Sequence, residues 1–105
     1  MRNETTRGQL DLLVLSVLAA GPLHGYGVVS ELRRRSGGEL AMAEGTLYPA
    51  LHRLERAGLL ASEWDERAPR RRRVYRLTRD GHAALDGRRR EWRSFAAAVQ
   101  KVVSA

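Results

Sequence analysis

The sequence predicts a small, mainly α-helical domain with one β-hairpin. Its 105 residues suffice for one domain, residues 1–105, with a single modest core. Leucine, valine and alanine supply most of its apolar residues, and leucines recur at the three- and four-residue spacing of amphipathic helices. Two short β-prone runs flank one charged turn between residues 59 and 78. The expected order is therefore helix, helix, helix, hairpin, helix.

The first helix is expected from Thr6 to about Ala20. Thr6 and Gln9 fit a capping box, T-x-x-Q, and a Gly-Pro pair ends the apolar run. Leu12 and Leu15 lie off the inner stripe, so the helix is apolar on nearly all sides. Either a second chain covers the Leu12 and Leu15 side, or the helix is central in its own domain. The inner stripe consists of Leu10, Leu13, Val14, Val17 and Leu18.

The second helix is expected from His24 or Gly25 to about Ser36, with three residues facing the core: Tyr26, Val29 and Leu32. Three arginines form its last turn and two glycines follow. Arginines at this position suit the negative end of the helix dipole, and contact with a phosphate is the alternative role.

The third helix is expected in the stretch EGTLYPALHRLERAG, Glu44 to Gly58. Its leucines share one side. Pro49 allows two starts: either Thr46 is the N-cap and Pro49 falls in the first turn, or the helix begins at Glu44. In the second case Pro49 removes the hydrogen bond to the Gly45 carbonyl.

The outer face of this third helix is small at its beginning and basic further on. A helix that enters a DNA major groove, about 12 Å wide, needs little bulk where it enters and donors where it meets base edges and phosphates. We therefore expect DNA contacts from this helix. The candidates are Thr46, Tyr48, Pro49, His52, Arg53 and Arg56.

The hairpin is expected in the runs LLASEW and RVYRLT, with a charged turn between them. Thr78 is a good N-cap for a last helix over about residues 79–103. Apolar residues along this helix recur at heptad spacing, which suits pairing with another helix. The seam consists of Leu85, Trp92, Phe95, Val99 and Val102, with Arg88 as a polar intruder.

Positive charge is concentrated in the last third of the chain. Residues 1–66 carry seven basic and nine acidic side chains, whereas residues 67–105 carry twelve basic and three acidic ones. A basic surface of this kind points to a polyanion, with nucleic acid favoured over membrane. Arginines at or near the hairpin tip can reach backbone phosphates or a minor groove. They are Arg67, Arg70, Arg71, Arg72 and Arg73.

Other classes of protein are disfavoured by composition and motifs. The chain has no cysteine, its longest apolar run is too short to cross a bilayer, and no secretory signal is recognisable, so we expect a cytoplasmic protein. None of the three histidines, His24, His52 and His82, has a second histidine or a cysteine at helical spacing as a metal-ligand partner. We expect no enzyme, cofactor or metal.

The motifs LDLLVLSVLAAGPLHGYGVVSEL, EGTLYPALHRLERAGLL and RRRRVYRLTRDGHAAL resemble the PadR family of transcriptional regulators, in its short form with a single C-terminal helix. The resemblance implies a winged helix-turn-helix fold and a homodimer joined through the terminal helices. It also implies a recognition helix at residues 44–58 and repression of a promoter with an inverted repeat. The family often has serine before the recognition helix, where this chain has Ala43, so a weaker helix cap is expected.

The resemblance also allows a small aromatic effector to bind between the last helices, because some family members bind flat aromatic compounds there. Trp92 stands at the matching place, and its alternative role is that of an anchor in the dimer interface. The residues expected at the effector pocket or dimer interface are Leu12, Leu15, Leu85, Trp92, Phe95 and Val99.

Two rival functions remain open on the sequence alone. One is a basic RNA-binding or ribosome-associated module, although RNA recognition usually shows exposed aromatic residues on a sheet for stacking. The other is a protein-interaction adaptor that kept the fold. The preferred reading is a dimeric, sequence-specific DNA-binding regulator that acts as a repressor.

Overall fold

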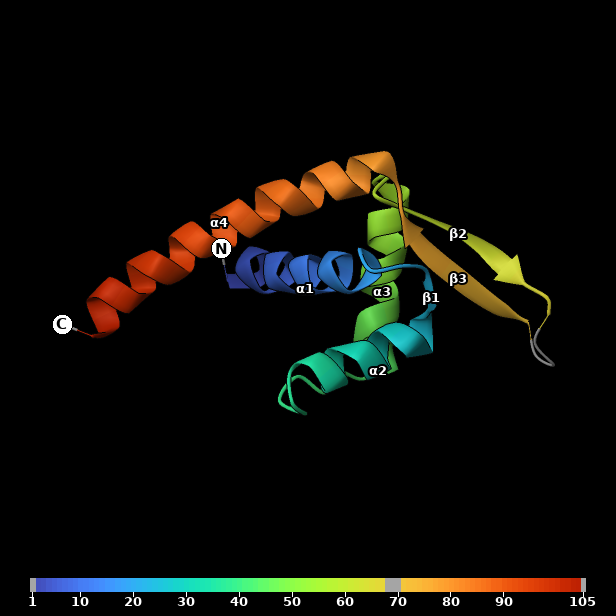
Figure 1. Cartoon of the computed structure of the whole chain (residues 1–105), viewed down its shortest axis with the longest axis horizontal. Coiled ribbons are helices and arrows are strands. Elements are labelled where there is room, and N and C mark those ends of the chain that lie inside the picture. The colour runs from blue at the N-terminus through green and yellow to red at the C-terminus, as the bar shows by residue number, and fades with distance from the viewer. Residues whose placement is uncertain (1, 68–70, 105) are drawn as a thin grey trace.

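The computed structural model describes residues 2–67 and 71–104, which form four helices and one three-stranded sheet (Figure 1). The predicted order of helices and hairpin is confirmed, with one short strand added. The elements are α1 (Arg2–Leu18), β1 (Leu23–His24), α2 (Gly25–Arg35), α3 (Glu44–Arg56), β2 (Leu60–Asp65), β3 (Arg72–Leu77) and α4 (Arg79–Val103).

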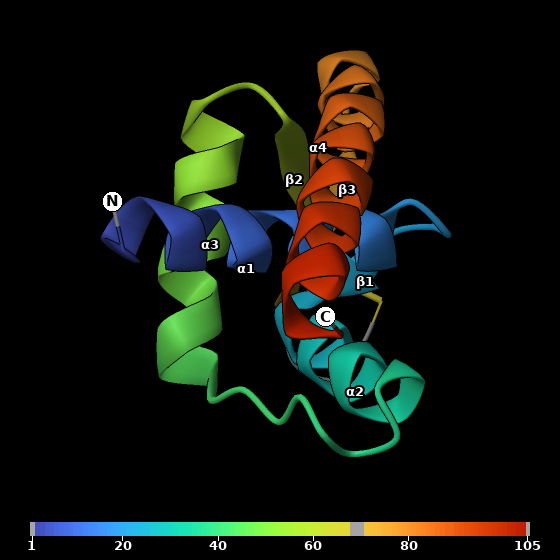
Figure 2. The same ribbon diagram turned by 90° about the vertical axis from the view of Figure 1, so that its left-hand side faces the viewer.

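Helix α1 crosses the middle of the molecule and packs against the other three helices (Figures 1 and 2). It begins at Arg2, so Thr6 lies within it and the predicted capping box is wrong. No glycine or proline interrupts residues 2–5, and the helix continues through them. Leu15 has 0% exposure because this chain's own core surrounds it. A second chain therefore does not cover Leu15, while Leu12 remains partly exposed.

Helix α2 buries one face against the core. Gly25, Val28, Val29 and Leu32 are buried, which is the i, i+3, i+4, i+7 spacing of one helix side. Tyr26 was predicted to face inward, but it is 61% exposed. Because Tyr26 follows Gly25 directly, it is rotated by about 100° from that buried line.

Helix α3 begins at Glu44, with Ala43 as the N-cap, and the alternative start at Thr46 is wrong. No side chain caps this end, as expected where alanine replaces serine. Pro49 lies inside the helix, so its missing N–H leaves the Gly45 carbonyl without its helical partner. The buried side consists of Leu47, Ala50, Leu51 and Leu54.

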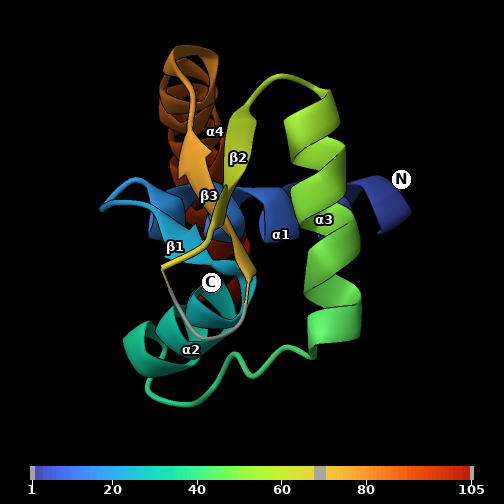
Figure 3. The same ribbon diagram turned by 90° about the vertical axis from the view of Figure 1, so that its right-hand side faces the viewer.

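The sheet has the order β1-β3-β2, and both pairings are antiparallel. The hairpin pairs Leu60 with Leu77 at its base and Asp65 with Arg72 near its tip. The predicted two-stranded hairpin is corrected to three strands, because Leu23 and His24 pair with the free edge of β3. Figure 3 shows this sheet beside α3.

Helix α4 starts at the base of the hairpin and extends far beyond the rest of the molecule (Figure 1). The predicted N-cap is confirmed: the Thr78 hydroxyl oxygen accepts a hydrogen bond from the Gly81 N–H at 3.0 Å. Leu85 is buried in the core, whereas the apolar residues further along the helix are exposed. Within residues 2–67 and 71–104, no helix is long and apolar enough to span a membrane.

Candidate nucleic-acid interface

The face of α3 opposite its leucines is open to solvent. It carries small residues near its N-terminal end and basic or polar residues further along. This face bears no packing contacts of the core, so its side chains are available to a ligand. The exposed residues are Gly45, Thr46, Pro49, His52 and Arg56.

Tyr48 lies at the flank of α3, where it packs against the first residue of α2. A Cβ atom at Gly25 would lie 2.6 Å from Cε1 and 2.7 Å from the hydroxyl oxygen of Tyr48, so only glycine permits this contact. Tyr48 is consequently half-buried and helps to set the distance between α2 and α3.

Arg53 was expected among the DNA contacts, but its guanidinium forms an ion pair with Asp11 of α1. The Asp11 side chain is 8% exposed and that of Arg53 is 35% exposed. Arg88 of α4 approaches the other carboxylate oxygen of Asp11 at 4.0 Å. A single buried carboxylate therefore lies between arginines from two other helices, and Arg53 joins α3 to α1.

The hairpin forms the wing, and its two faces differ because side chains alternate along a strand. Ser62 and Trp64 of β2 lie opposite Tyr75 and Arg73 of β3, on the face that continues into the core. Arg71 precedes β3 and lies over the Trp64 ring on this same face. Of the other predicted tip residues, Arg67 and Arg72 are exposed, and Arg70 lies outside the described residues.

A chain of hydrogen bonds connects the wing to α3. The Arg73 Nε–H donates to the Ser62 hydroxyl oxygen at 2.7 Å, and this hydroxyl donates to the Glu55 Oε2 atom at 2.6 Å. All three residues are partly buried, where such contacts are screened less than at the surface. The wing is thus held at a defined orientation relative to the outer face of α3.

A groove of about 330 Å³ lies between the wing and the two neighbouring helices. Its lining includes the start of α2, Tyr48 and His52 of α3, and Trp64 and Arg71 of the wing. We call it the wing groove. It combines cationic side chains with hydroxyl and imidazole groups, which are donors suited to phosphate oxygens.

Asp65 terminates β2 and holds the described end of the wing in place. The Arg67 backbone N–H donates to its Oδ1 atom at 3.1 Å, and this contact, together with the Arg67 guanidinium, lowers the pKa of Asp65 below its ordinary value. His24 Nε2 of β1 lies 3.4 Å from the other oxygen of Asp65. Asp65 therefore stays ionised and fastens the turn to the sheet.

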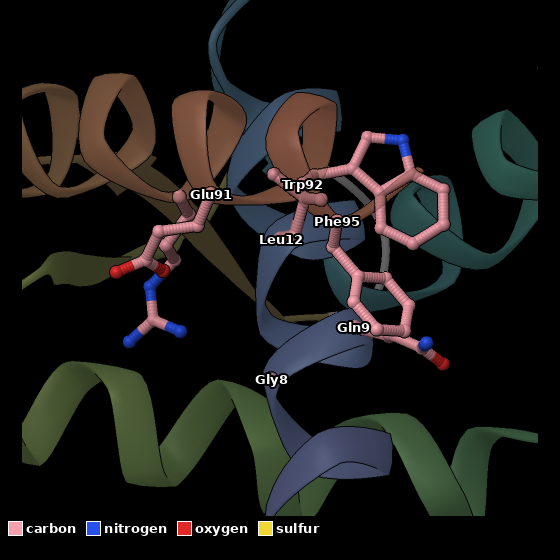
Figure 4. A pocket seen from close by; sticks show the side chains of 7 residues that line it. Gly8, Gln9, Leu12, Glu91, Trp92 and Phe95 are labelled. Carbon is pink, nitrogen blue, oxygen red and sulfur yellow. The ribbon is translucent and has the colours of Figure 1, made fainter. Parts of the chain in front are cut away.

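A second surface lies between α1 and α4. Gln9, Leu12, Trp92 and Phe95 line a pocket of about 340 Å³, together with Gly8, Arg88 and Glu91 (Figure 4). The Trp92 and Phe95 ring centroids are 6.2 Å apart, a distance typical of interacting aromatic pairs. Both rings project from α4 to the same side of the helix (Figure 4).

Two of the residues predicted for this surface do not belong to it. Leu15 and Leu85 are 0% and 2% exposed within the single chain, so neither reaches a partner or an effector. Both belong to the hydrophobic core. Leu12 and Trp92 line the pocket with Phe95, and Val99 continues the exposed apolar face.

Comparison with known proteins identifies the class. Residues 14–87 match the transcriptional regulator PadR-like family. The chain is 42% identical over 96 residues to transcriptional regulator Rv3488 of Mycobacterium tuberculosis, an alignment that covers 91% of this chain and 87% of that protein.

Solved structures of related proteins share the architecture. A transcriptional regulator of Clostridium thermocellum, Cth-833, superposes with a TM-score of 0.85 at 31% identity, over 93% of this chain and 96% of that one. A PadR family regulator of Eggerthella lenta gives 0.82 at 38% identity, over 98% and 88% of the two chains. The PadR of Bacillus subtilis in complex with operator DNA shares the fold with a TM-score of 0.67 at 24% identity, over 74% and 44%.

The fold and these relatives define a winged-helix regulator of transcription. The chain belongs to the PadR-like family. The predicted family and fold class are therefore confirmed, and the family consists of transcriptional regulators and not of enzymes. Within the described residues, no cluster of three or more histidine or acidic side chains could hold a metal ion.

Several contacts of the site could not be predicted from the sequence. Asp11 and Arg53 are 42 positions apart, and no local pattern links them. One part of the wing contacts is predictable from the sequence, because Ser62 and Trp64 are two residues apart and lie on the same side of a predicted strand. Which residues of the next strand lie opposite them depends on the register of the hairpin.

Proposed function

We propose that this transcriptional regulator binds duplex DNA as a homodimer at an inverted-repeat operator and represses the adjoining promoter. The observation that carries the proposal is that His52, on the outer face of α3, lines the same groove as three arginines of the wing, Arg71, Arg72 and Arg73. A helix can then enter the major groove while the wing lies along the sugar-phosphate backbone. Such a role implies a cytoplasmic location.

The exposed residues of α3 are proposed to make two kinds of contact, one with the bases and one with the phosphates. Thr46, Pro49 and His52 lie on the part that enters the groove, with Tyr48 at its flank. Arg56 follows one turn later and is placed for a phosphate. Arg53 supports the helix through Asp11, so its proposed part in binding is to orient α3.

The wing arginines contribute mainly charge. Exposed Arg71 and Arg72, with Arg70 beside them in the sequence, are proposed to contact phosphates, while the Arg73 Nε–H is already bonded to Ser62. Phosphate contacts fix the register of the protein on the duplex and release counterions.

The dimer is proposed to form along α4. Trp92, Phe95 and Val99 are 44%, 53% and 40% exposed in the single chain, and Val102 continues the same face with 78% exposure. An apolar seam of this length, on a helix that leaves its own domain, is typical of a helix that pairs with another one. Two-fold symmetry then places two α3 helices on half-sites about 34–36 Å apart.

A small aromatic effector is proposed to occupy the pocket between α1 and α4. Its lining of Leu12, Trp92 and Phe95 is apolar, and its volume of about 340 Å³ lies within the range of small-molecule sites. Because α4 also carries the proposed dimer seam, a ligand at this site would alter the spacing of the two recognition helices.

The first experiment asks which polymer the protein retains. Genomic DNA fragments captured by the purified protein are sequenced, and one retained duplex is competed against RNA of equal length at one salt concentration. An inverted repeat among the fragments and preference for the duplex support the proposal. Preference for RNA supports the alternative of an RNA-binding module, and retention of neither polymer supports the adaptor.

The second experiment measures the contribution of the wing. The triple variant Arg70→Gln, Arg71→Gln, Arg72→Gln should weaken binding to all duplexes and reduce the slope of log K against log salt by about 2–3, since each phosphate contact contributes about 0.9. Fluorescence anisotropy at several salt concentrations measures the slope. The matched control replaces three arginines in the last turn of α2 with glutamine: Arg33, Arg34 and Arg35. Arg34 and Arg35 pair with Glu31. An unchanged slope in the wing variant would reject the phosphate contacts.

The third experiment tests the effector pocket. In a Trp64→Phe background, Trp92 is the sole tryptophan, and a bound flat aromatic compound should quench its emission in a saturable way. Leu12→Asp should abolish the quenching. Equal quenching in both proteins would show that the compound binds elsewhere.

A further inference from the structure

The wing carries a tryptophan to which the proposed DNA contacts give no role. Trp64 lies in β2 with 48% of its surface exposed, and two arginines stack on its ring. The guanidinium carbon of Arg71 lies 4.4 Å from the ring centroid, and that of Arg73 lies 5.1 Å from it. Both distances are within the range of cation–π attraction, about 6 Å.

The two arginines are held differently. Arg73 is also bonded to Ser62, which in turn bonds to Glu55 of α3, so its position is fixed relative to the recognition helix. Arg71 lies closer to the tip and is exposed, and the contact described for its guanidinium is the Trp64 ring. The Trp64 ring contacts both arginines, so it links Arg71 to Arg73 and, through Arg73, to α3.

Stacking suits an arginine that must still bind a phosphate. The flat face of the guanidinium meets the ring, while its N–H donors lie in the guanidinium plane and remain free for an anion. A free arginine side chain loses rotamer freedom when it binds, and an arginine that is already ordered loses less. Arg71 and Trp64 both line the wing groove beside His52 of α3.

We propose that Trp64 is a positioning residue that holds the Arg71 guanidinium at the wing groove, in the orientation in which it meets a backbone phosphate beside α3. The inference rests on the proposed DNA binding and names the contact that Trp64 serves. Trp64 itself acts through Arg71 and does not read the bases.

The test is a double-mutant cycle on affinity for a duplex that the wild-type protein retains, measured by anisotropy at one low salt concentration. Trp64→Leu should weaken binding about fivefold, or about 1 kcal/mol, the size of an exposed cation–π contact. In an Arg71→Gln background the same change should have less than about a twofold effect. In an Arg72→Gln background it should keep its full effect, because Arg72 is not stacked on the ring in the described structure.

Two further measurements separate positioning from folding. Trp64→Phe keeps an aromatic face and should bind within about twofold of wild type. In a Trp92→Phe background without DNA, Arg71→Gln should shift the Trp64 emission, because the stacked cation is removed. This readout does not require the leucine variant to fold.

The outcomes distinguish this inference from the proposed function. If wild type binds duplex but Trp64→Leu binds equally well, or if Trp64→Leu loses fivefold in the Arg71→Gln background too, the positioning role is overturned and DNA binding stands. An unshifted Trp64 emission in Arg71→Gln overturns it as well. If the wild-type protein retains no duplex at all, the proposed function fails first, and the inference fails with it.

Discussion

Gly81 shows how one missing side chain permits the junction between the wing and α4. A Cβ atom at this position would lie 2.1 Å from the Leu59 carbonyl oxygen, a backbone atom that cannot move aside easily. The Gly81 N–H also donates to Thr78, which caps the helix. The helix therefore starts against the backbone that leads into β2.

Gly81→Ala should lower the free energy of unfolding by about 2–4 kcal/mol, because the added methyl group forces the two backbones apart. Gly87→Ala is the matched control on the same helix. Its Cβ would meet only an Arg90 nitrogen, at 3.8 Å, so it should stabilise the protein by about 0.5–1 kcal/mol. Urea unfolding followed by circular dichroism measures both. Equal effects of the two substitutions would contradict the close approach.

Glu31 gives the stability a defined pH dependence. Two hydrogen bonds from Arg34, followed by one from Arg35, lower the pKa of Glu31 from 4.5 to about 2. Since the folded-state pKa is depressed, the pairing stabilises the fold above pH 4.5, and this stabilisation is lost as the pH falls toward 2.

Glu31→Gln should consequently destabilise the protein at pH 7 and progressively less at lower pH. Urea unfolding of both proteins between pH 3 and pH 7 tests this, with an excess of wild-type stability that shrinks on acidification. The Glu31 side chain is 25% exposed and both arginine partners are more exposed than it, so a small effect is expected. A constant difference across the pH range would refute the assignment.

Asp11 connects three helices through one carboxylate. Arg53 of α3 and Arg88 of α4 both approach it, and its side chain is almost wholly buried on α1. This buried carboxylate links α3 and α4 to α1 through charged contacts, in addition to the apolar contacts of the core.

Asp11→Asn should lower the free energy of unfolding by about 1–3 kcal/mol, because the amide keeps the shape but leaves two arginines without their anion. Arg56→Gln, on the exposed side of α3, serves as the control and should stay within about 0.5 kcal/mol of wild type. Thermal unfolding of the three proteins provides the comparison. An Asp11→Asn protein as stable as wild type would show that the contacts of Asp11 with Arg53 and Arg88 do not stabilise the fold.

The elements differ in how far the sequence predicts them. The leucines of α3 and the cap of α4 are local signals, and both elements were predicted correctly. Strand β1 has two residues between a proline and a glycine, so it shows no alternation, and it exists only because β3 offers a free edge about fifty positions later. Tyr26 was misplaced because one residue of helical phase decides which side it takes.

The same distinction applies to the candidate site. The outer face of α3 follows from helical periodicity, so its exposed residues were named in advance. The pairing of Arg53 with Asp11 and the stacking of Arg71 on Trp64 depend on contacts between separate elements. Charge and spacing identify the cations of a surface, but tertiary contacts decide which of them remain free.

The shape of the whole chain supports the proposed dimer. The molecule measures 55 × 29 × 24 Å, and its length arises because α4 extends away from the body at the end opposite the wing (Figure 1). Most of the large exposed apolar side chains lie on this helix. Single helices of this kind seldom persist unpaired in water.

Val99→Asp should weaken the dimer at least tenfold, because two-fold symmetry would bury a carboxylate from each chain in the apolar seam. Ala97→Asp places the same charge on the opposite side of α4 and should leave association unchanged. Sedimentation equilibrium gives the dissociation constants. Equal association of the two variants would remove α4 from the proposed interface.

Helix α3 has a packed side that stabilises the domain and an open side that is proposed to select the DNA sequence. The domain needs the buried side chains of Leu47, Leu51 and Leu54 in order to fold. It does not need the exposed side chains of Thr46, Pro49 and His52 for packing. After gene duplication, substitutions on the open side of α3 could therefore change the proposed operator sequence with little change in the stability of the fold.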